Sequence, residues 1–247
     1  MDFSVFFQPA FSGGGIYLDW VLSGIKWTLL VSILGWIIAF SVGSVLGVLR
    51  TTPLAILRAP ATVYVEVFRN VPLLVQMFIW YFVLPEIVPE SMGDWLKTRM
   101  PMPEFWNAVL CLGFYTASRV AEQVRSGIQS IPRGQTEAGL AMGLTRAQVY
   151  RHVLLPMGYR IVIPPLTSEF LTIFKNSSVA LTIGVLELTA QARQISEYTF
   201  RTFEAFTIAT VVYLLITLTV TVAMRSLEKK VRVPGYIGSG NAPQEKH

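Results

Sequence analysis

The sequence is poor in the residues from which most enzyme active sites and metal centres are built. Its 247 residues include one cysteine, Cys111, and two histidines, His152 and His247. A disulfide framework or a cysteine metal site is therefore excluded, and a histidine-based triad or metal cluster is not expected. The phosphate-binding pattern Gly-x-x-x-x-Gly-Lys-Ser/Thr is absent as well, so we expect no cofactor in this chain and any ATP chemistry has to come from a partner.

Charged residues are also scarce. They make up 14% of the chain against 53% hydrophobic residues, and the mean hydropathy is +0.52. This composition is typical of a polytopic membrane protein that contacts lipid, not of a soluble domain. The net charge of +5 is spread along the chain, which favours membrane topology over nucleic-acid binding as its explanation. Asp2 is acidic and no basic segment precedes a short apolar core, so a signal peptide is not expected.

About five stretches have the length and apolar character of membrane spans: residues 21–49, 62–84, 105–124, 161–184 and 205–225. The first is unambiguous, because Trp27–Leu49 carries no charge. It also contains Gly43 and Gly47 in a Gly-x-x-x-Gly pattern, which indicates either a face for close helix packing or the ordinary abundance of glycine in membrane helices. The fourth stretch is the weakest, because Pro164 and Lys175 are among the residues that interrupt it.

The distribution of basic residues indicates that the fourth stretch crosses the membrane. Arginines at 50–69 and at 125–160 lie on one side if the second and third spans form a hairpin. The basic segment 225–232 joins them only if an even number of crossings follows Arg160, and cytoplasmic loops collect Lys and Arg. The sequence thus predicts one all-α membrane domain over 1–247, with the N-terminus periplasmic, the C-terminus cytoplasmic and a disordered tail at about 234–247.

The most informative segment lies at about 130–156, between the third and fourth stretches. Pro132 can open a short helix, and Gly143 can close it in the left-handed conformation. Thr145 and Gln148 then have the spacing of a capping box, and Pro156 is expected to stop the second helix. This punctuation predicts a helix–Gly–helix loop on the cytoplasmic side.

The loop resembles the EAA loop of ABC-importer permeases. It matches that pattern at five positions: Glu137, Ala138, Gly143, Leu155 and Pro156. Gly139 replaces the second alanine of the pattern, and Val153 replaces the isoleucine. In that family the loop docks into a cytoplasmic ATPase, so the resemblance implies a coupling role. The alternative interpretation is an ordinary amphipathic loop.

Two basic residues, Arg119 and Lys175, fall inside the expected spans. A basic side chain near the bilayer centre costs about 2.5–3.5 kcal/mol even on insertion scales, and such residues usually face the bundle interior or a wet cavity. Arg119 could instead pair with Glu122 or extend toward the cytoplasm. Lys175 could pair with Glu169 or with a carboxylate of a partner subunit.

A polar stripe surrounds Lys175. Ser168, Thr172, Lys175 and Asn176 follow the spacing of one helix face, and Ser177 comes directly after them. On a membrane helix such a stripe is typical of a cavity lining. A seam between helices, joined by hydroxyl and amide hydrogen bonds, is the alternative.

Several segments resemble the polar amino-acid branch of ABC permeases, and together they extend the resemblance over about 20–234. They are residues 68–76, 121–135, 175–178 and 187–189. Most of the branch has tyrosine where this chain has Arg119, and the extra cation suits an anionic substrate. The overall pattern is most similar to glutamate/aspartate permeases. Our hypothesis is that Arg119 and Lys175 attract the substrate carboxylates while Asn176, Ser177 and Thr172 supply neutral hydrogen bonds.

The resemblance also implies partners and a location. It implies a bacterial inner-membrane subunit that is not an enzyme, a second permease subunit that is a paralogue, ATPase subunits that bind ATP and Mg²⁺, a periplasmic amino-acid-binding protein and surrounding lipid. An importer of the same class for glutamine or another polar amino acid is an alternative. An ion-coupled secondary transporter is a further one, although no internal repeat supports it, and an intramembrane enzyme lacks facing catalytic residues.

Overall fold

The computed structural model describes residues 2–11 and 15–231, and most of these residues are helical. The elements in chain order are η1 (Phe3–Phe7), α1 (Tyr17–Leu49), α2 (Ala55–Asn70), α3 (Leu73–Phe78), η2 (Ile79–Val83), α4 (Leu84–Ile87), α5 (Glu90–Asp94), η3 (Trp95–Arg99), α6 (Pro103–Gln129), α7 (Arg133–Ala141), α8 (Arg146–Val149), η4 (Tyr150–Leu154), α9 (Leu155–Asn176), η5 (Ser177–Ile183), α10 (Leu188–Thr199) and α11 (Thr202–Val231). The predicted all-α class is confirmed. The tail predicted at 234–247 lies outside the described residues.

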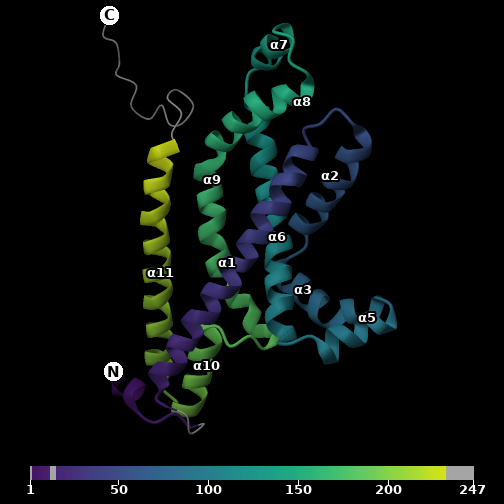
Figure 1. Cartoon of the computed structure of the whole chain (residues 1–247). Coiled ribbons are helices and arrows are strands. Elements are labelled where there is room, and N and C mark those ends of the chain that lie inside the picture. The colour runs from purple at the N-terminus through teal and green to yellow at the C-terminus, as the bar shows by residue number, and fades with distance from the viewer. Residues whose placement is uncertain (1, 12–14, 232–247) are drawn as a thin grey trace, which may run out of the picture.

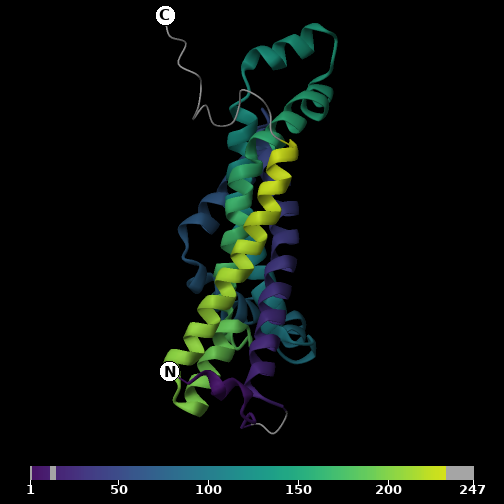
Figure 2. The same cartoon turned by 90° about the vertical axis from the view of Figure 1, so that its left-hand side faces the viewer.

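The long helices α1, α6, α9 and α11 run lengthwise through an elongated bundle (Figures 1 and 2). α1 packs along α6, α6 packs against α9, and α11 packs against α9 and α10. α7 and α8 lie at one end of the bundle, which we call the loop end, and α11 finishes there as well (Figure 1). The start of α1, α5 and α10 lie at the opposite end (Figure 1).

Length and apolar composition identify fewer membrane spans than the sequence predicts. Tyr17–Leu49 and Thr202–Lys230 qualify as single helices, and two bent helix pairs raise the number to as many as 4. α6 does not qualify among the described helices, because it carries polar residues such as Asn107 and Arg119. Many α6 side chains are buried against neighbouring helices, so this helix needs less apolar surface than one surrounded by lipid. The number of about five spans stays a prediction.

The second predicted span, at 62–84, is divided in two. α2 and the segment Leu73–Ile87 meet at 106°. Pro72 has no N–H and restricts the residue before it, and Val71 is accordingly extended, with φ −91° and ψ 128°. The Gln76 amide spans the break and donates to the carbonyls of Phe68 at 2.8 Å and Val71 at 2.9 Å. The freed backbone acceptors are thus satisfied inside the protein, as a low-dielectric surrounding requires.

Pro156 was expected to stop the second loop helix, and that prediction is wrong. α8, η4 and α9 follow one another without a break, and Pro156 lies in the first turn of α9. η4 is a π-helical turn in which the Leu155 N–H bonds to the Tyr150 carbonyl. This wider turn accommodates a residue that has no N–H. The helical path therefore continues from the loop directly into the fourth predicted span.

The fourth predicted span, at 161–184, changes helix type along its length. α9 includes Pro164 and Pro165 and ends at Asn176, after which η5 continues as a 3-10 helix. Gly184 ends η5 with φ +95°, a left-handed conformation that favours glycine. The path of the chain then bends into α10 by 51°.

The Gly-x-x-x-Gly pattern of α1 faces α6 at close range. A Cβ atom added to Gly43 would lie 2.7 Å from the Ala117 carbonyl oxygen, and one added to Gly47 would lie 2.7 Å from that of Ala121. Such distances are shorter than a carbon–oxygen contact allows. The two glycines therefore let the backbones of α1 and α6 approach, as in other small-residue membrane interfaces.

We expect Gly43→Ala to destabilise the protein by about 1–3 kcal/mol, because the new methyl group overpacks the contact with α6. The measurement is the thermal unfolding midpoint of the purified protein in detergent. Gly134→Ala is the matched control, since a Cβ atom at Gly134 meets nothing within 4 Å. An alanine there favours the helix by about 1 kcal/mol, so its midpoint should stay or rise. Equal midpoints for the two variants would contradict close α1–α6 packing.

Candidate functional site

Arg119 lies on α6 and forms an ion pair with Glu169 of α9. Its Nε donates to Glu169 Oε2 at 2.8 Å. The Glu169 side chain is 11% exposed, whereas that of Arg119 is 42% exposed. The alternative prediction, that Arg119 pairs with Glu122, is therefore wrong. The charge of Arg119 is balanced by an acid from another helix, and part of its guanidinium stays open to the surface of this chain.

Glu122 forms ion pairs with other arginines and not with Arg119. Arg50 Nη1 from the end of α1 lies 2.5 Å from Glu122 Oε2. Arg125, one turn further along α6, also pairs with Glu122, and Arg69 Nη1 lies 3.7 Å away. The side chain of Arg50 is only 8% exposed. This cluster joins α1, α2 and α6, and removing Glu122 would leave the buried Arg50 charge without its nearest carboxylate, which is destabilising.

Lys175 lies on the exposed part of α9. It forms no ion pair with Glu169 in the described chain, since the two residues are six positions apart and do not share a face of α9, and Glu169 bonds to Arg119, so that alternative is wrong. Ser168 is exposed, and Thr172 and Asn176 are half-buried, on the same stripe. The spacing of these residues thus gives a continuous polar strip on the surface of α9, with one cation in it.

The hydroxyl groups of this region already have backbone partners. Thr172 donates to the Ser168 carbonyl at 2.8 Å, and Ser177 donates to the Phe174 carbonyl at 2.7 Å. Ser177 is fully buried at the start of η5, whereas Thr172 keeps a partly open position. A hydroxyl whose proton is used in this way can still accept a hydrogen bond. Ser177 therefore lies behind the strip that Lys175 and Thr172 form.

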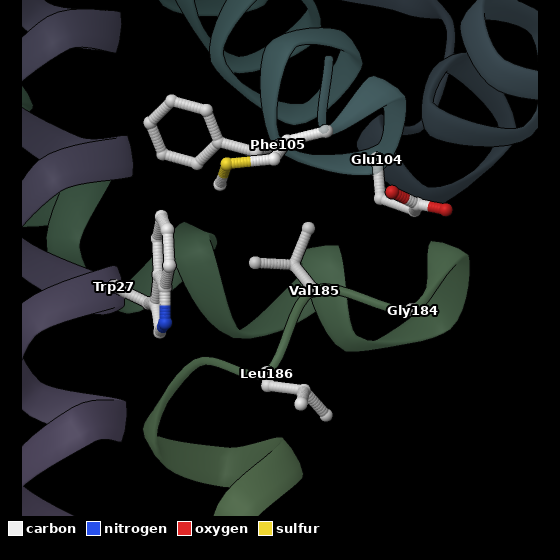
Figure 3. Close-up of a pocket in the computed structure, with 7 residues that line it drawn as sticks. Trp27, Glu104, Phe105, Gly184, Val185 and Leu186 are labelled. Carbon is white, nitrogen blue, oxygen red and sulfur yellow. The ribbon is translucent and has the colours of Figure 1, made fainter. Parts of the chain in front are cut away.

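A cavity of about 150 Å³ lies between α1, the start of α6 and residues 184–186 (Figure 3). Trp27 and Phe105 line it together with Val185 and Leu186, and Glu104 is the charged residue among its lining residues. The Glu104 carboxylate accepts a hydrogen bond from the Tyr81 hydroxyl at 3.1 Å. An apolar hollow with one acidic group does not suit a carboxylate, because like charges repel and the carboxylate would lack hydrogen-bond donors. We do not assign this cavity to an anionic substrate.

The helix–Gly–helix loop, residues 130–156, has the local geometry that the sequence predicts. Gly143 adopts φ +84°, and Thr145 and Gln148 form a reciprocal capping box with bonds of 2.8 and 3.3 Å. The residues of the EAA pattern lie mostly at the surface: Glu137, Ala138, Gly143 and Pro156 are exposed and Leu155 is half-buried. Met142, beside Gly143 at the tip of the loop, is 82% exposed. The loop thus presents both polar and apolar groups away from the bundle.

Sequence reasoning missed two contacts that matter at this site. Glu169 was considered for Lys175 and not for Arg119, although a lone acid in an apolar stretch is a signal that a buried cation lies nearby. Tyr150 was not considered, and its hydroxyl donates to the Thr51 carbonyl at 2.8 Å. No sequence signal connects two residues 99 positions apart.

The family model for the binding-protein-dependent transport system inner membrane component matches residues 39–233. The glutamate/aspartate import permease protein GltJ of Escherichia coli strain K12 is 49% identical over 239 residues, 96% of this chain and 97% of that protein. The probable glutamine ABC transporter permease protein GlnM of Bacillus subtilis strain 168 is 34% identical over 221 residues, 90% of this chain and 95% of that protein.

Solved structures agree with these matches. A crystal structure of an amino acid ABC transporter with histidines has a chain with a TM-score of 0.74 and 30% identity, covering 87% of this chain and 95% of that one. An inward-facing structure of the MetNI methionine ABC transporter supports the fold, with a TM-score of 0.72 at 21% identity over 87% of this chain and 98% of that one. The chain therefore belongs to the family of binding-protein-dependent transport system inner membrane components, permease subunits of ABC transporters that are not themselves enzymes.

Proposed function

We propose that this chain is the permease subunit of an ATP-driven importer for the acidic amino acids glutamate and aspartate. The observation that carries the proposal is its 49% identity, over 96% of the chain, to a glutamate/aspartate import permease. The chemistry of the site agrees with that substrate class. Arg119 and Lys175 are positive groups with open surface on α6 and α9, and carboxylates are the groups that such cations bind best.

The subunit lies in the bacterial inner membrane with about five spans, the N-terminus in the periplasm and the helix–Gly–helix loop in the cytoplasm. The spans are α1, the bent α2–α4 segment, α6, α9 with η5, and α11. Exposed basic residues gather at the loop end: Arg133, Arg146, Arg151 and Arg160. Glu90 and Asp94 belong to α5, at the other end of the bundle (Figure 1). This asymmetry agrees with the excess of Lys and Arg in cytoplasmic loops.

Arg119 and Lys175 contribute differently to the binding of an anionic substrate. Glu169 uses one of the five guanidinium N–H donors of Arg119, so others are free for a substrate carboxylate. Because Glu169 neutralises Arg119, the attraction of this pair for an anion is short-range and directional. Lys175, without an acid partner among the described residues, supplies the net positive charge. Thr172 and Asn176 lie next to it and complete the contacts, while Ser177 supports the start of η5 from behind.

Transport follows alternating access, with energy from separate ATPase subunits that bind ATP and Mg²⁺. No cofactor is bound by this chain itself. The loop residues Glu137, Ala138, Gly143, Leu155 and Pro156 form the surface that receives the ATPase. A periplasmic binding protein delivers the substrate, and a second permease subunit, a paralogue, completes the pathway. ATP binding moves the loops and opens the pathway outward, and hydrolysis returns it to the inward-facing state.

We expect Arg119→Tyr to weaken glutamate and aspartate uptake by about 10- to 100-fold, the value of a charge-assisted hydrogen bond. Glutamine uptake should fall much less, because its side chain carries no charge. The measurement is ATP-driven uptake of the three labelled amino acids by proteoliposomes that contain the full complex and its binding protein. In Arg119→Tyr alone, the Glu169 carboxylate is left buried and unpaired, which is destabilising by itself. The double variant Arg119→Tyr/Glu169→Gln removes that charge and so controls for the effect on folding.

Lys97→Ala is the matched control for charge, since Lys97 is an exposed cation paired with Glu86 at 2.6 Å near the other end of the bundle. It should leave uptake unchanged. Unaltered uptake and unaltered substrate preference in both Arg119 variants would remove Arg119 from the substrate site. A wild-type complex that prefers glutamine to glutamate would favour the alternative importer.

We expect Gly143→Ala to lower the amount of substrate imported per ATP hydrolysed. Gly143 has φ +84° and open space around it, so the added methyl group costs about 1–2 kcal/mol through the backbone conformation alone. The loop would then shift its two helices relative to each other. The measurement is uptake and ATP hydrolysis in the same proteoliposomes.

Gly134→Ala provides the comparison, because that position is also in the loop with open space but without a left-handed backbone. The binding protein should still dock onto both variants, since it contacts the opposite face. An unchanged ratio of uptake to hydrolysis in Gly143→Ala would argue against a coupling role for the loop.

A further inference from the structure

Tyr150 forms a hydrogen bond between the helix–Gly–helix loop and the end of α1. Its hydroxyl donates to the Thr51 carbonyl at 2.8 Å and lies 3.3 Å from Thr51 Oγ1. Tyr150 begins the π-helical turn η4, and Thr51 follows the last residues of α1. The carbonyls at the end of a helix have no partner within that helix. Thr51 lies just beyond the C-cap Arg50, in the turn that follows α1, and the Tyr150 hydroxyl supplies a partner for its carbonyl from a distant part of the chain.

The end of α1 that Tyr150 contacts is fixed firmly to the rest of the bundle. Thr51 Oγ1 donates to the Val48 carbonyl at 2.7 Å, which holds the terminal turn in shape. The next residue back, Arg50, bonds to Glu122 of α6 at 2.5 Å. Gly47 lies directly against α6 at Ala121. A force applied at Thr51 thus reaches both α1 and α6 within one helical turn.

The remaining contacts of the loop with the bundle are apolar or continuous with α9. α7 packs mainly against α8 and η4, which are parts of the same loop. Val149 and Leu154 are buried in a cluster with Ile128 and Ile131. Apolar contacts of this kind have no preferred direction, whereas a hydrogen bond fixes both distance and angle. The Tyr150–Thr51 bond is the directional contact between the loop and α1 in the described residues.

We propose that Tyr150 is a coupling residue, which transmits movement of the loop to α1. This inference rests on the proposed role of the loop as the surface that receives the ATPase. α6 and α9 need no such contact, because both are connected to the loop through the backbone. Without the Tyr150 bond, the loop moves with α9 while α1 follows less completely, so the pathway opens in fewer cycles.

The test is Tyr150→Phe in the complete complex, with its ATPase subunits and binding protein, in proteoliposomes. Phenylalanine keeps the ring and its packing and removes only the hydroxyl. Uptake per ATP hydrolysed should fall about fivefold, the equilibrium change that corresponds to one neutral hydrogen bond. Assembly with the ATPase and stimulation of hydrolysis by the loaded binding protein should stay as in the wild type.

Tyr159→Phe is the matched control. Tyr159 lies on α9 close to the loop, is half-buried and packs its ring near Phe40, and its hydroxyl makes no hydrogen bond with the described residues. The same loss of a hydroxyl should leave its coupling unchanged. An equal loss in both variants would mean that any tyrosine hydroxyl in this region matters, which overturns the proposal.

A second measurement separates coupling from folding. Cys111 is a buried free cysteine, so a Cys111→Ser background allows spin labels at chosen pairs of exposed sites. One label at Met142 follows the loop, and one at Leu22 follows the far end of α1, both of which are exposed. The distance between the two labels should change on ATP binding by less in the wild type than in Tyr150→Phe, because the loop of the variant moves without α1.

The outcomes distinguish this inference from the proposed function. A wild-type complex that imports without ATP hydrolysis would remove the proposed function and this inference with it. A coupled wild type together with a fully coupled Tyr150→Phe would overturn the inference alone. Loss of ATPase assembly in Tyr150→Phe would show that the bond shapes the docking surface, and this also contradicts transmission to α1.

Discussion

The close contact between α1 and α6 is the constraint on which the rest of the structure depends. Gly43 and Gly47 allow the two backbones to meet at distances that no side chain would permit. This approach places Arg50, at the end of α1, beside Glu122 on α6. A wider separation would leave the buried Arg50 side chain without its carboxylate, and an unpaired buried charge is strongly destabilising. The glycine contacts and the Arg50–Glu122 ion pair therefore both require the same short distance between α1 and α6.

The basic residues of the bundle differ in whether their charge takes part in helix packing. Arg50 is nearly fully buried and shares Glu122 with other arginines, so its charge serves the packing of α1, α2 and α6. Arg119 and Lys175 keep more of their surface open, the first beside Glu169 and the second without an acid partner in the described residues. A charge that remains accessible can exchange partners, whereas a buried one in a cluster cannot do so without separating helices. Accessibility alone does not separate the two groups, since Arg69 beside Glu122 is 44% exposed, but the open surface of Arg119 and Lys175 is what their proposed binding role requires.

The features that sequence could predict are those that depend on neighbours along the chain. The apolar first span, the left-handed Gly143 and the Thr145–Gln148 capping box all follow from local chemistry, and the structure contains each of them. The partner of Arg119 could not be predicted in this way. Glu122 has the right spacing on the same helix, but Arg50 occupies it from 72 residues away. Partners across helices depend on register, which no local pattern encodes.

The prolines show that backbone conformation, too, depends on more than the local sequence. Pro72 breaks its segment sharply, and the two parts meet at 106°. Pro156 has the same missing N–H and yet lies in a continuous helical path, because the π-helical turn before it shifts the hydrogen-bond partners. Whether a proline stops a helix therefore depends on the turn that precedes it. That turn is stabilised by long-range packing of residues such as Leu154, which is buried against other helices.

The uninterrupted path through Pro156 has a mechanical consequence for the two ends of the protein. From Tyr150 to Lys175 the helix covers about 38 Å at 1.5 Å per residue, so one element reaches from the loop to the polar strip. Pro164 and Pro165 lie near its middle, where they remove two N–H donors and make bending less costly. α9 is attached to α6 on both sides of these prolines, through Gly158 against Ile128 and through Glu169 with Arg119. The loop is therefore connected to the polar strip of α9 through the backbone, whereas α1, which has no direct backbone connection to the loop, meets it through side-chain contacts such as that of Tyr150 with Thr51.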